Sequence, residues 1–324
     1  MLQRVVIDGF RGLSTVDVPV RPLTALIGQN DTGKSSFLHA LNFLFGIPNT
    51  DLSLPDVRRF DRNQTVVVEG WFGGPKPYKK TFQVINGAGA VTPLADCPEA
   101  TTYQGRAAMF FLPAWGVSTI CEGSAGATAP PLLGDGGNLA DVLDYFLRND
   151  RKRFDAIEIA VRTHVRGVES VNIPTPGRAA ERSIDLVIDG GLKIAARNAS
   201  AGVRLMLFFI TLAYHPQPPK LILFEEPENG VHPKRLADIT RLFREITEGK
   251  HGEPAQIVLT THSPYMLDNL DPARDQVLVF SRRDDGSRTA QATDAERLKA
   301  FLDEFMLGEV WFNQGEEGLL AKAQ

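Results

Sequence analysis

The sequence predicts an α/β fold: a mostly parallel, doubly wound sheet with an N-terminal antiparallel β subdomain and an inserted helical lobe. Three observations favour it. Short apolar runs alternate with helical patterns in the last third of the chain, which is typical of parallel strands joined by crossover helices. Two strand-like segments, 2–8 and 14–20, open the chain as an antiparallel pair. A helical pattern over 138–166 interrupts the strands in the middle.

The first buried run, 23–27, leads directly into a glycine-rich loop that fits G-x-x-x-x-G-K-[ST] and opens a helical pattern. Glycine lets backbone N–H groups turn toward phosphates, and a helix N-terminus attracts anions. Lys34 adds a mobile positive charge and Ser35 a ligand for Mg²⁺. The motif predicts a P-loop NTPase. The loop residues expected to bind the nucleotide are Gln29, Asn30, Asp31, Thr32, Gly33, Lys34, Ser35 and Ser36.

The remaining elements follow from periodicity and from turn residues. Strands are expected at 66–72, 79–85 and 107–112, and the segments 86–105 and 116–138, rich in Gly, Ala and Pro, are expected to be loops. Further strands are expected at 168–174, 182–189, 192–196, 220–224, 256–260 and 276–281, with helices at 200–213 and 232–247. We expect one domain over 1–324, with a β and P-loop lobe (1–112), a helical lobe with connecting strands (113–197) and a third lobe (198–324).

Two adjacent carboxylates, Glu225 and Glu226, follow the buried strand 220–224. Such a pair is costly to bury unless a cation or a proton neutralises it, and Mg²⁺ on nucleotide phosphates would do so. We expect Glu225 to bind the metal, directly or through water, together with Ser35, and Glu226 to orient and deprotonate the attacking water. The alternative interpretation is a solvated acidic loop.

A lone histidine, His262, follows the next buried strand, 256–260. A lone histidine is usually structural or exposed. The carboxyl ends of parallel strands share one edge of the sheet, however, so His262 is expected near the γ-phosphate. Lys34, Glu226 and His262 form the predicted catalytic set.

Composition excludes several classes of protein. The 324 residues carry a formal net charge of −4, so no global basic field indicates nucleic acid. Two basic clusters, 58–62 and 148–153, contain acidic residues as well, and DNA contact stays open. Cys97 and Cys121 lack metal-like spacing, which suits a reducing cytoplasm. We find neither a signal peptide nor an apolar run long enough to span a membrane, so no membrane partner is expected.

The order and spacing of these motifs resemble an ABC-type ATPase head of the SMC/RecF-like group. Within it, the chain is most similar to the ATPase part of overcoming-lysogenization-defect (OLD) proteins and to AAA-family ATPases of bacterial defence systems. Besides the phosphate loop, the acidic pair and His262, four segments carry the resemblance: the early Gly-Phe-Arg-Gly (9–12), the signature-like 199–204, the D-loop-like 229–232 and the late Gly-Glu-Val-Trp (308–311).

The resemblance implies hydrolysis of ATP with Mg²⁺ and a homodimer in which two heads sandwich two ATP molecules. Ser200 and Gly202 would then contact the γ-phosphate of the partner copy, and Arg11 is also expected to bind the nucleotide. By itself, Ser200 also fits a plain helix cap. A role in antiviral defence or DNA repair is implied, through a separate nuclease or another effector, or through DNA.

The chain departs from the family pattern in three places. Glu225 stands where Asp is usual, and Ala201 stands where transporters have Gly. The glutamine that couples the metal to the helical lobe is not identifiable, with Gln64 and Gln104 as weak candidates. The pair Asp284–Asp285 reads as a turn, so a nuclease would be a separate polypeptide.

Two other functions stay open: a nucleotide-gated scaffold with negligible turnover, and the ATPase subunit of a membrane transporter. The large middle insertion and the missing Gly-Gly signature argue against the transporter. A GTPase is disfavoured because no Asn-Lys-x-Asp is present.

Overall fold

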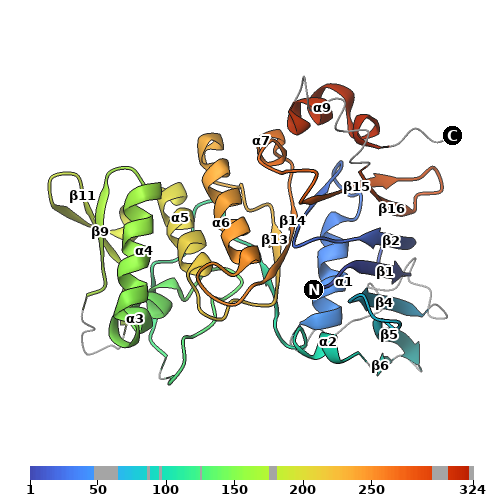
Figure 1. The fold of residues 1–324 in the computed structure, drawn as a ribbon, viewed down its shortest axis with the longest axis horizontal. Coiled ribbons are helices and arrows are strands. Elements are labelled where there is room, and N and C mark those ends of the chain that lie inside the picture. The colour runs from blue at the N-terminus through green and yellow to red at the C-terminus, as the bar shows by residue number, and fades with distance from the viewer. Residues whose placement is uncertain are drawn as a thin grey trace. The chain divides into compact units, whose positions relative to one another are not determined.

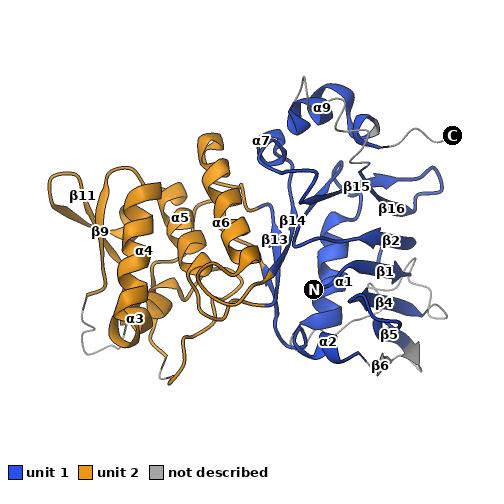
Figure 2. Cartoon of the chain, viewed as in Figure 1, with its two compact units in different colours: residues 1–109, 220–226, 256–324 blue, residues 110–219, 227–255 orange. Residues whose placement is uncertain are grey.

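Figure 1 shows the fold in a computed structural model, which describes residues 1–46, 65–85, 88–94, 97–124, 126–174, 181–293 and 306–320. The chain divides into two compact units (Figure 2). Unit 1 comprises residues 1–109, 220–226 and 256–324, and unit 2 comprises residues 110–219 and 227–255. Each unit therefore collects segments that are distant in the sequence.

Unit 1 contains an antiparallel sheet with the order β2-β1-β4-β5-β6. Its strands are β1 (Arg4–Asp8), β2 (Thr15–Pro19), β4 (Val66–Trp71), β5 (Tyr78–Ile85) and β6 (Ala88–Leu94). This confirms the expected antiparallel pair at the N-terminus. The predicted loop at 86–105 was wrong, because β6 pairs with residues 79–85 of β5 and the short helix α2 (Pro98–Thr101) follows it. Pairing with a neighbouring strand outweighs weak local propensity.

The second sheet of unit 1 has the order β16-β15-β3-β14-β13-β7. Its strands are β3 (Leu23–Ile27), β7 (Ala107–Phe110), β13 (Leu221–Glu225), β14 (Gln256–Thr260), β15 (Gln276–Arg282) and β16 (Arg288–Ala292). The four strands β15, β3, β14 and β13 run parallel, and β16 is antiparallel at the edge. A mostly parallel α/β sheet is thereby confirmed. Strand β7 ends at Phe110, two residues earlier than predicted.

Helix α1 (Lys34–Phe45) packs against strands of both sheets, β4 of the antiparallel sheet and β13 and β14 of the parallel one. Its apolar side chains are fully buried, and Phe37 meets Phe280 of β15 edge to face with ring centroids 5.6 Å apart. Because the phosphate loop runs into the N-terminal end of α1, this packing fixes where the loop lies.

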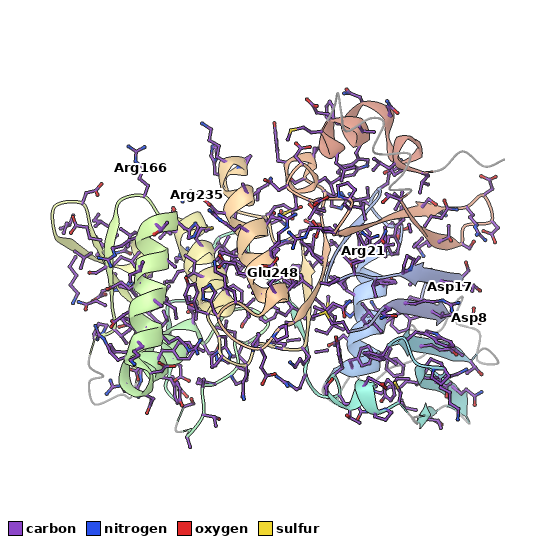
Figure 3. The ribbon with its side chains drawn as sticks, viewed as in Figure 1. Asp8, Asp17, Arg21, Arg166, Arg235 and Glu248 are labelled. Carbon is purple, nitrogen blue, oxygen red and sulfur yellow. The ribbon has the colours of Figure 1, made fainter. Side chains whose placement is uncertain are left out.

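The C-terminal part of unit 1 is tied down by α7 (Pro264–Leu267), α9 (Leu307–Gln314) and the 3₁₀ helix η5 (Glu316–Leu319). The N–H of Gly308 donates to the Asp268 carboxylate at 2.7 Å, and a side chain at position 308 would collide with the backbone of Pro264. Arg21, labelled in Figure 3, donates to the carbonyl of Ala273 at 2.9 Å. These contacts hold the segments after β14 against the sheet.

The described residues of unit 2 form four long helices, α3 (Leu139–Asn149), α4 (Arg151–His164), α5 (Ala201–Ala213) and α6 (Leu236–Glu248). One small sheet joins β9 (Val168–Asn172), β11 (Asp185–Ile188) and β12 (Leu192–Ala195), and another joins β8 (Ile120–Glu122) and β10 (Glu181–Ser183). The short 3₁₀ helices η3 (Ala196–Asn198) and η4 (Pro233–Arg235) precede α5 and α6. The prediction of a loop over 116–138 was wrong at β8.

Among the described residues, no helix combines the length and the apolar character that crossing a membrane requires.

Candidate functional site

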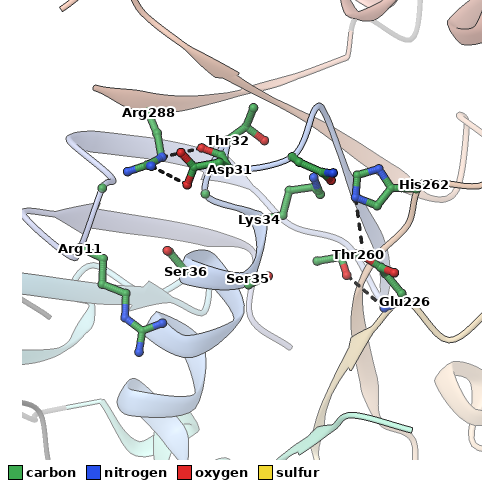
Figure 4. A pocket seen from close by; sticks show the side chains of 13 residues that line it. Arg11, Asp31, Thr32, Lys34, Ser35, Ser36, Glu226, Thr260, His262 and Arg288 are labelled. Carbon is green, nitrogen blue, oxygen red and sulfur yellow. Dashed lines mark hydrogen bonds and ion pairs between the residues drawn. The ribbon is translucent and has the colours of Figure 1, made fainter. Parts of the chain in front are cut away.

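Three neighbouring parallel strands of unit 1, β3, β14 and β13, end at the same edge of the sheet. In the register, Glu225 pairs with Thr260, and Thr260 pairs with Leu26. A cavity of about 250 Å³ lies at this edge (Figure 4). Its walls are residues 30–36, the turn that holds Arg11 and Gly12, the residues Glu226, Thr260 and His262 at the strand ends, and Arg288 of β16. The cavity lies wholly within unit 1.

The phosphate loop can take its path only because glycine stands at two positions. Gly28 has φ 137°, and a Cβ there would lie 2.3 Å from the carbonyl oxygen of Phe280. Gly33 has φ 104°, and a Cβ would lie 2.7 Å from the side chain of Leu13. Inside the loop, the Thr32 hydroxyl donates to the carbonyl of Gln29 at 2.8 Å. The loop is therefore built to bring backbone close to a ligand.

Lys34 is the first residue of α1 and is 6% exposed. Its ammonium donates to the carbonyls of Gly28 and Gln29 at 2.7 and 2.8 Å. Burial lowers the pKa of the ammonium, and the nearby carboxylates, Glu226 first, oppose that shift. A positive charge is thus held in the loop where phosphate groups would lie.

The Ser35 hydroxyl donates to the carboxylate of Glu225, the last residue of β13. Hydroxyl and carboxylate oxygens are the ligands that Mg²⁺ prefers, and Mg²⁺ usually takes only one or two ligands from a protein and completes its shell with water and phosphates. The two side chains fit that metal. In the described part of the chain, no group of three or more His, Cys, Asp or Glu side chains could hold a metal ion by itself.

Glu226 turns the chain sharply at the end of β13. Its φ is 46°, which an L-residue rarely adopts, and its N–H donates to the Thr260 hydroxyl at 3.1 Å. The carboxylate points toward His262, with 3.6 Å between Oε1 and Nε2 (Figure 4). Thr260 thus fixes the backbone that aims the Glu226 side chain.

His262 lies just beyond β14, with 36% of its side chain exposed. Burial lowers the pKa of its imidazole; the Lys34 charge lowers it further, and Glu226 raises it. The ring is therefore neutral at neutral pH and has one nitrogen to donate and one to accept a hydrogen bond.

Strain is concentrated at this cavity. Three non-glycine residues have positive φ among the described residues: Arg11 at 51°, Asp31 at 62° and Glu226 at 46°. All three line the cavity. Left-handed backbone at non-glycine residues is costly and is retained where function needs a special geometry. The guanidinium of Arg11 lies 5.4 Å from the centroid of the Phe10 ring.

The structure thus brings most of the predicted site residues together. Asn30 to Ser36, Arg11, Glu226 and His262 line one cavity. Gln29 and Glu225 do not line it, but they hydrogen-bond to Lys34 and Ser35, which do. Ser200 and Gly202 belong to unit 2, where the Ser200 hydroxyl caps α5 by accepting from the N–H of Val203 at 3.3 Å.

Sequence reasoning missed three residues of the cavity, Gly12, Thr260 and Arg288. Gly12 directly follows the predicted Arg11, and Thr260 lies two positions before the predicted His262. Their proximity in the sequence to predicted site residues was therefore a signal. Arg288 carried none, because its strand has no motif. Its guanidinium contacts Asp31 through the carboxylate and the carbonyl, each at 2.6 Å.

Of the other candidates from the sequence, those that the structure describes do not line this cavity. Gln64 and the basic cluster 58–62 lie outside the described residues. Gln104 hydrogen-bonds to the hydroxyl of Tyr78. In the second basic cluster, Arg148, Arg151 and Arg153 each form an ion pair with an aspartate three or four positions away in the sequence. Asp285 accepts from the N–H of Ser287 at 2.8 Å, as a turn residue does.

Two family models match parts of the chain. Residues 1–87 match a family described as "AAA ATPase domain", and residues 128–268 match one described as "AAA domain, putative AbiEii toxin, Type IV TA system". A curated relative, the OLD nuclease of Thermus scotoductus, is 41% identical over 46 residues. That match spans 14% of this chain and 9% of the relative, so the chain aligns with a small part of the nuclease.

Solved structures share the fold over nearly the whole chain. An SMC head bound to the C-terminal winged-helix domain of ScpA covers 92% of this chain and 99% of its own, with TM-score 0.63 and 13% identity. The SMC head domain of Thermotoga maritima covers 90% and 99%, with TM-score 0.52 and 14% identity. An SMC head with an extended coiled coil, bound to the C-terminal domain of ScpA, from Pyrococcus furiosus, covers 94% and 98%, with TM-score 0.60 and 12% identity.

At such low identity the structural likeness shows the fold, and the family models add the AAA-type ATPase sequence. Together they show that the chain shares the fold of SMC heads and that parts of its sequence resemble AAA-type ATPase domains.

Proposed function

We propose that this SMC/OLD-like ATPase binds Mg·ATP in the cavity of unit 1, hydrolyses it, and dimerises head-to-tail around two nucleotides to control a separate effector or DNA. The observation that carries the proposal is the meeting of three motifs at one sheet edge: Lys34 after β3, the Ser35–Glu225 contact at β13, and Glu226 facing His262 at β14. Charge, metal ligands and a carboxylate base are then within one site.

In the proposed reaction, Lys34 and the backbone N–H groups of the loop bind the phosphates. Glu226 orients the attacking water and takes its proton, and the neutral His262 contacts the γ-phosphate. When bound, Mg²⁺ would be held by Ser35 and Glu225 and would neutralise charge on the phosphates. Most of the rate enhancement would come from positioning and charge stabilisation.

The proposed dimer uses the N-terminus of α5, where Ser200 and Gly202 would meet the γ-phosphate of the partner copy. This α5 terminus presents backbone N–H groups and partial positive charge. A Cβ at Gly202 would meet only ordinary contact, 3.5 Å from the carbonyl of Gly230, so packing within unit 2 does not demand glycine there. Close approach of a second chain would explain it.

The effector is proposed from likeness alone. The short match to an OLD nuclease and the family described as a type IV toxin system support a role in antiviral defence, with DNA repair as the second setting. The effector would be a separate nuclease or a comparable protein. Cys97 and Cys121 are free thiols, which suits a cytoplasmic setting.

The test is the variant Glu226→Gln, compared with the wild type and with Glu248→Gln, an exposed glutamate of α6. We expect phosphate release to fall by about a hundredfold or more while Mg·ATP still binds. Dimers that require ATP should accumulate in sedimentation experiments. Unchanged turnover in Glu226→Gln would remove Glu226 from this role.

The same measurements separate the alternatives. Negligible turnover of the wild type with tight, γ-phosphate-dependent dimerisation would favour a nucleotide-gated scaffold. Co-purification with a membrane subunit would favour a transporter. Binding of duplex DNA, measured against salt with and without Mg·ATP, tests whether DNA is the effector.

A further inference from the structure

Arg288 reaches the nucleotide cavity from β16, an edge strand of the parallel sheet. Its Nη2 donates to the carboxylate of Asp31, and its Nε donates to the carbonyl of the same residue, both at 2.6 Å (Figure 4). One guanidinium therefore holds both the backbone and the side chain of the residue at the corner of the phosphate loop.

We propose that Arg288 is a positioning residue for the polyphosphate: it contacts the left-handed corner of the loop and, as its main effect on binding, cancels the Asp31 charge that would otherwise repel the phosphates. The inference rests on the proposed binding of a nucleoside triphosphate in this cavity.

Asp31 needs such a partner for two reasons. Its φ of 62° is a conformation that L-residues rarely adopt, so a contact outside the loop must help to keep it. Its carboxylate also lies in the loop that would bind a polyanion, with 71% of the side chain exposed. The hydrogen bond from Arg288 holds the pKa of Asp31 below its usual value, so the carboxylate is ionised at neutral pH.

The position of Arg288 is itself fixed by the turn that carries Arg11. The N–H of Arg288 donates to the carbonyl of Gly12, and the N–H of Ser14 donates to the carbonyl of Arg288, both at 3.2 Å. Gly12 also leaves the room that the guanidinium occupies, because a Cβ there would lie 1.6 Å from Nη1. The arginine is therefore a built part of the cavity, with 22% of its side chain exposed.

Two roles for Arg288 predict opposite results for Asp31→Asn. If Arg288 only holds the loop in place, losing either Arg288 or the Asp31 carboxylate weakens nucleotide binding. If it cancels charge, removing the carboxylate is harmless or favourable, and it rescues the loss of the arginine. The double variant Arg288→Gln with Asp31→Asn therefore separates the two roles.

The experiment measures the Kd of Mg·ATP by calorimetry for the wild type, the two single variants and the double variant. We expect Arg288→Gln to weaken binding about tenfold, Asp31→Asn not to weaken it, and the double variant to return to within about threefold of the wild type. The defect of Arg288→Gln should shrink at about 0.5 M salt, because salt screens charge repulsion. Mg·tripolyphosphate should reproduce the pattern, since the effect concerns the phosphates.

Arg283→Gln is the matched control, because it removes the same charge from the same hairpin at an exposed position outside the cavity. Gly12→Ala displaces the guanidinium while Asp31 keeps its charge, so it should weaken binding as Arg288→Gln does. Thermal unfolding shows whether each variant is folded.

A double variant as weak as Arg288→Gln, or equal effects of Arg283→Gln and Arg288→Gln, would overturn the inference. Failure of the folded wild type to bind Mg·ATP would instead overturn the proposed function. Normal binding by the wild type, loss in Lys34→Ala and no effect of Arg288→Gln would refute this inference alone.

Discussion

The two units treat buried charge differently. In unit 2, the buried carboxylate of Asp144 accepts from Arg148 and Arg182 at 2.7 and 2.6 Å, and that of Asp141 accepts from the backbone and hydroxyl of Ser124. In unit 1, the acceptors of the buried ammonium of Lys34 are two neutral backbone carbonyls. These two carboxylates of unit 2 are thus paired with opposite charges or donors inside the fold, whereas Lys34 of unit 1 faces a cavity.

This difference teaches which polar groups stabilise the protein and which serve a ligand. A buried group with matched partners adds to stability or holds one conformation, while a buried charge without an opposite charge costs free energy. The three left-handed residues support the same conclusion, because Arg11, Asp31 and Glu226 all line the cavity of unit 1. We therefore expect substitutions in unit 2 to change stability and substitutions at the cavity to change binding or turnover.

The largest effect should come from Lys34→Ala. We expect Mg·ATP binding to fall at least about a hundredfold, because the charge nearest the phosphates is lost. The free energy of unfolding should change by less than about 1 kcal/mol, since burial already disfavours this ammonium. Calorimetry with ATP and urea unfolding measure the two quantities.

Lys80→Ala is the matched control in the same unit. The ammonium of Lys80 also donates to a backbone carbonyl, that of Phe43 at 2.9 Å, and burial also lowers its pKa, but it lies outside the cavity. Nucleotide binding should be unchanged in this variant. Equal losses of nucleotide binding in Lys34→Ala and Lys80→Ala would contradict the claim that Lys34 serves the ligand because it lies at the cavity.

The largest loss of stability should come from Asp144→Ala in unit 2. Arg182, whose side chain is 17% exposed, would lose its carboxylate partner, and we expect about 3 kcal/mol of destabilisation with unchanged affinity for ATP. Urea unfolding measures it. Asp155→Ala removes the exposed pair with Arg151 and should cost less than about 0.5 kcal/mol. A similar cost for both would mean that burial of the pair is not what matters.

His215 makes the stability of unit 2 depend on pH. Its Nδ1 accepts from the N–H of Gln217 and its Nε2 donates to the carbonyl of Pro130, so the buried ring is neutral. Burial lowers its pKa from 6.5, so the unfolded chain binds the proton first as the pH falls. This contribution to the free energy of unfolding is constant above about pH 6.5 and decreases below it, by at most ~1.4 kcal/mol per pH unit, until the pH reaches the folded pKa.

The measurement is urea unfolding between pH 7.5 and 5.5. His215→Gln should be less stable at pH 7.5 but lose less stability on acidification than the wild type. His232→Gln, at an exposed position, should keep the slope of the wild type. An unchanged slope in His215→Gln would assign the acid sensitivity to other groups.

Much of the parallel sheet and the cavity could be predicted because the relevant signals are local and share one geometric rule. The phosphate loop, the acidic pair and His262 each follow a buried run, and parallel strands bring their carboxyl ends to one edge. The strands that were not predicted depend on pairing with other strands, which the local sequence pattern does not indicate. Strand β6 forms against β5 in a segment rich in Gly and Ala, and β8 has its partner, β10, far along the chain.

The same reasoning explains the missed cavity residues. Arg288 reaches Asp31 across 257 positions from an edge strand, and only the fold makes that contact. Thr260 belongs to the predicted strand before His262. Its role, however, lies in the hydrogen bond that its hydroxyl accepts from the N–H of Glu226, the residue after the neighbouring strand. A side chain whose role is a hydrogen bond to a backbone group gives no recognisable motif in the sequence.

Thr260→Val gives the smallest and most specific prediction. Valine keeps the shape of this buried position and removes the acceptor for the N–H of the left-handed Glu226. We expect kcat to fall about fivefold with KM nearly unchanged, because the carboxylate is aimed less well while the phosphate loop is untouched. Steady-state phosphate release measures both constants. Thr240→Val, which removes a buried hydroxyl bonded to the carbonyl of Leu236 in α6, should change stability and leave kcat unaltered. A rise in KM at constant kcat in Thr260→Val would show that Thr260 supports binding rather than the orientation of Glu226.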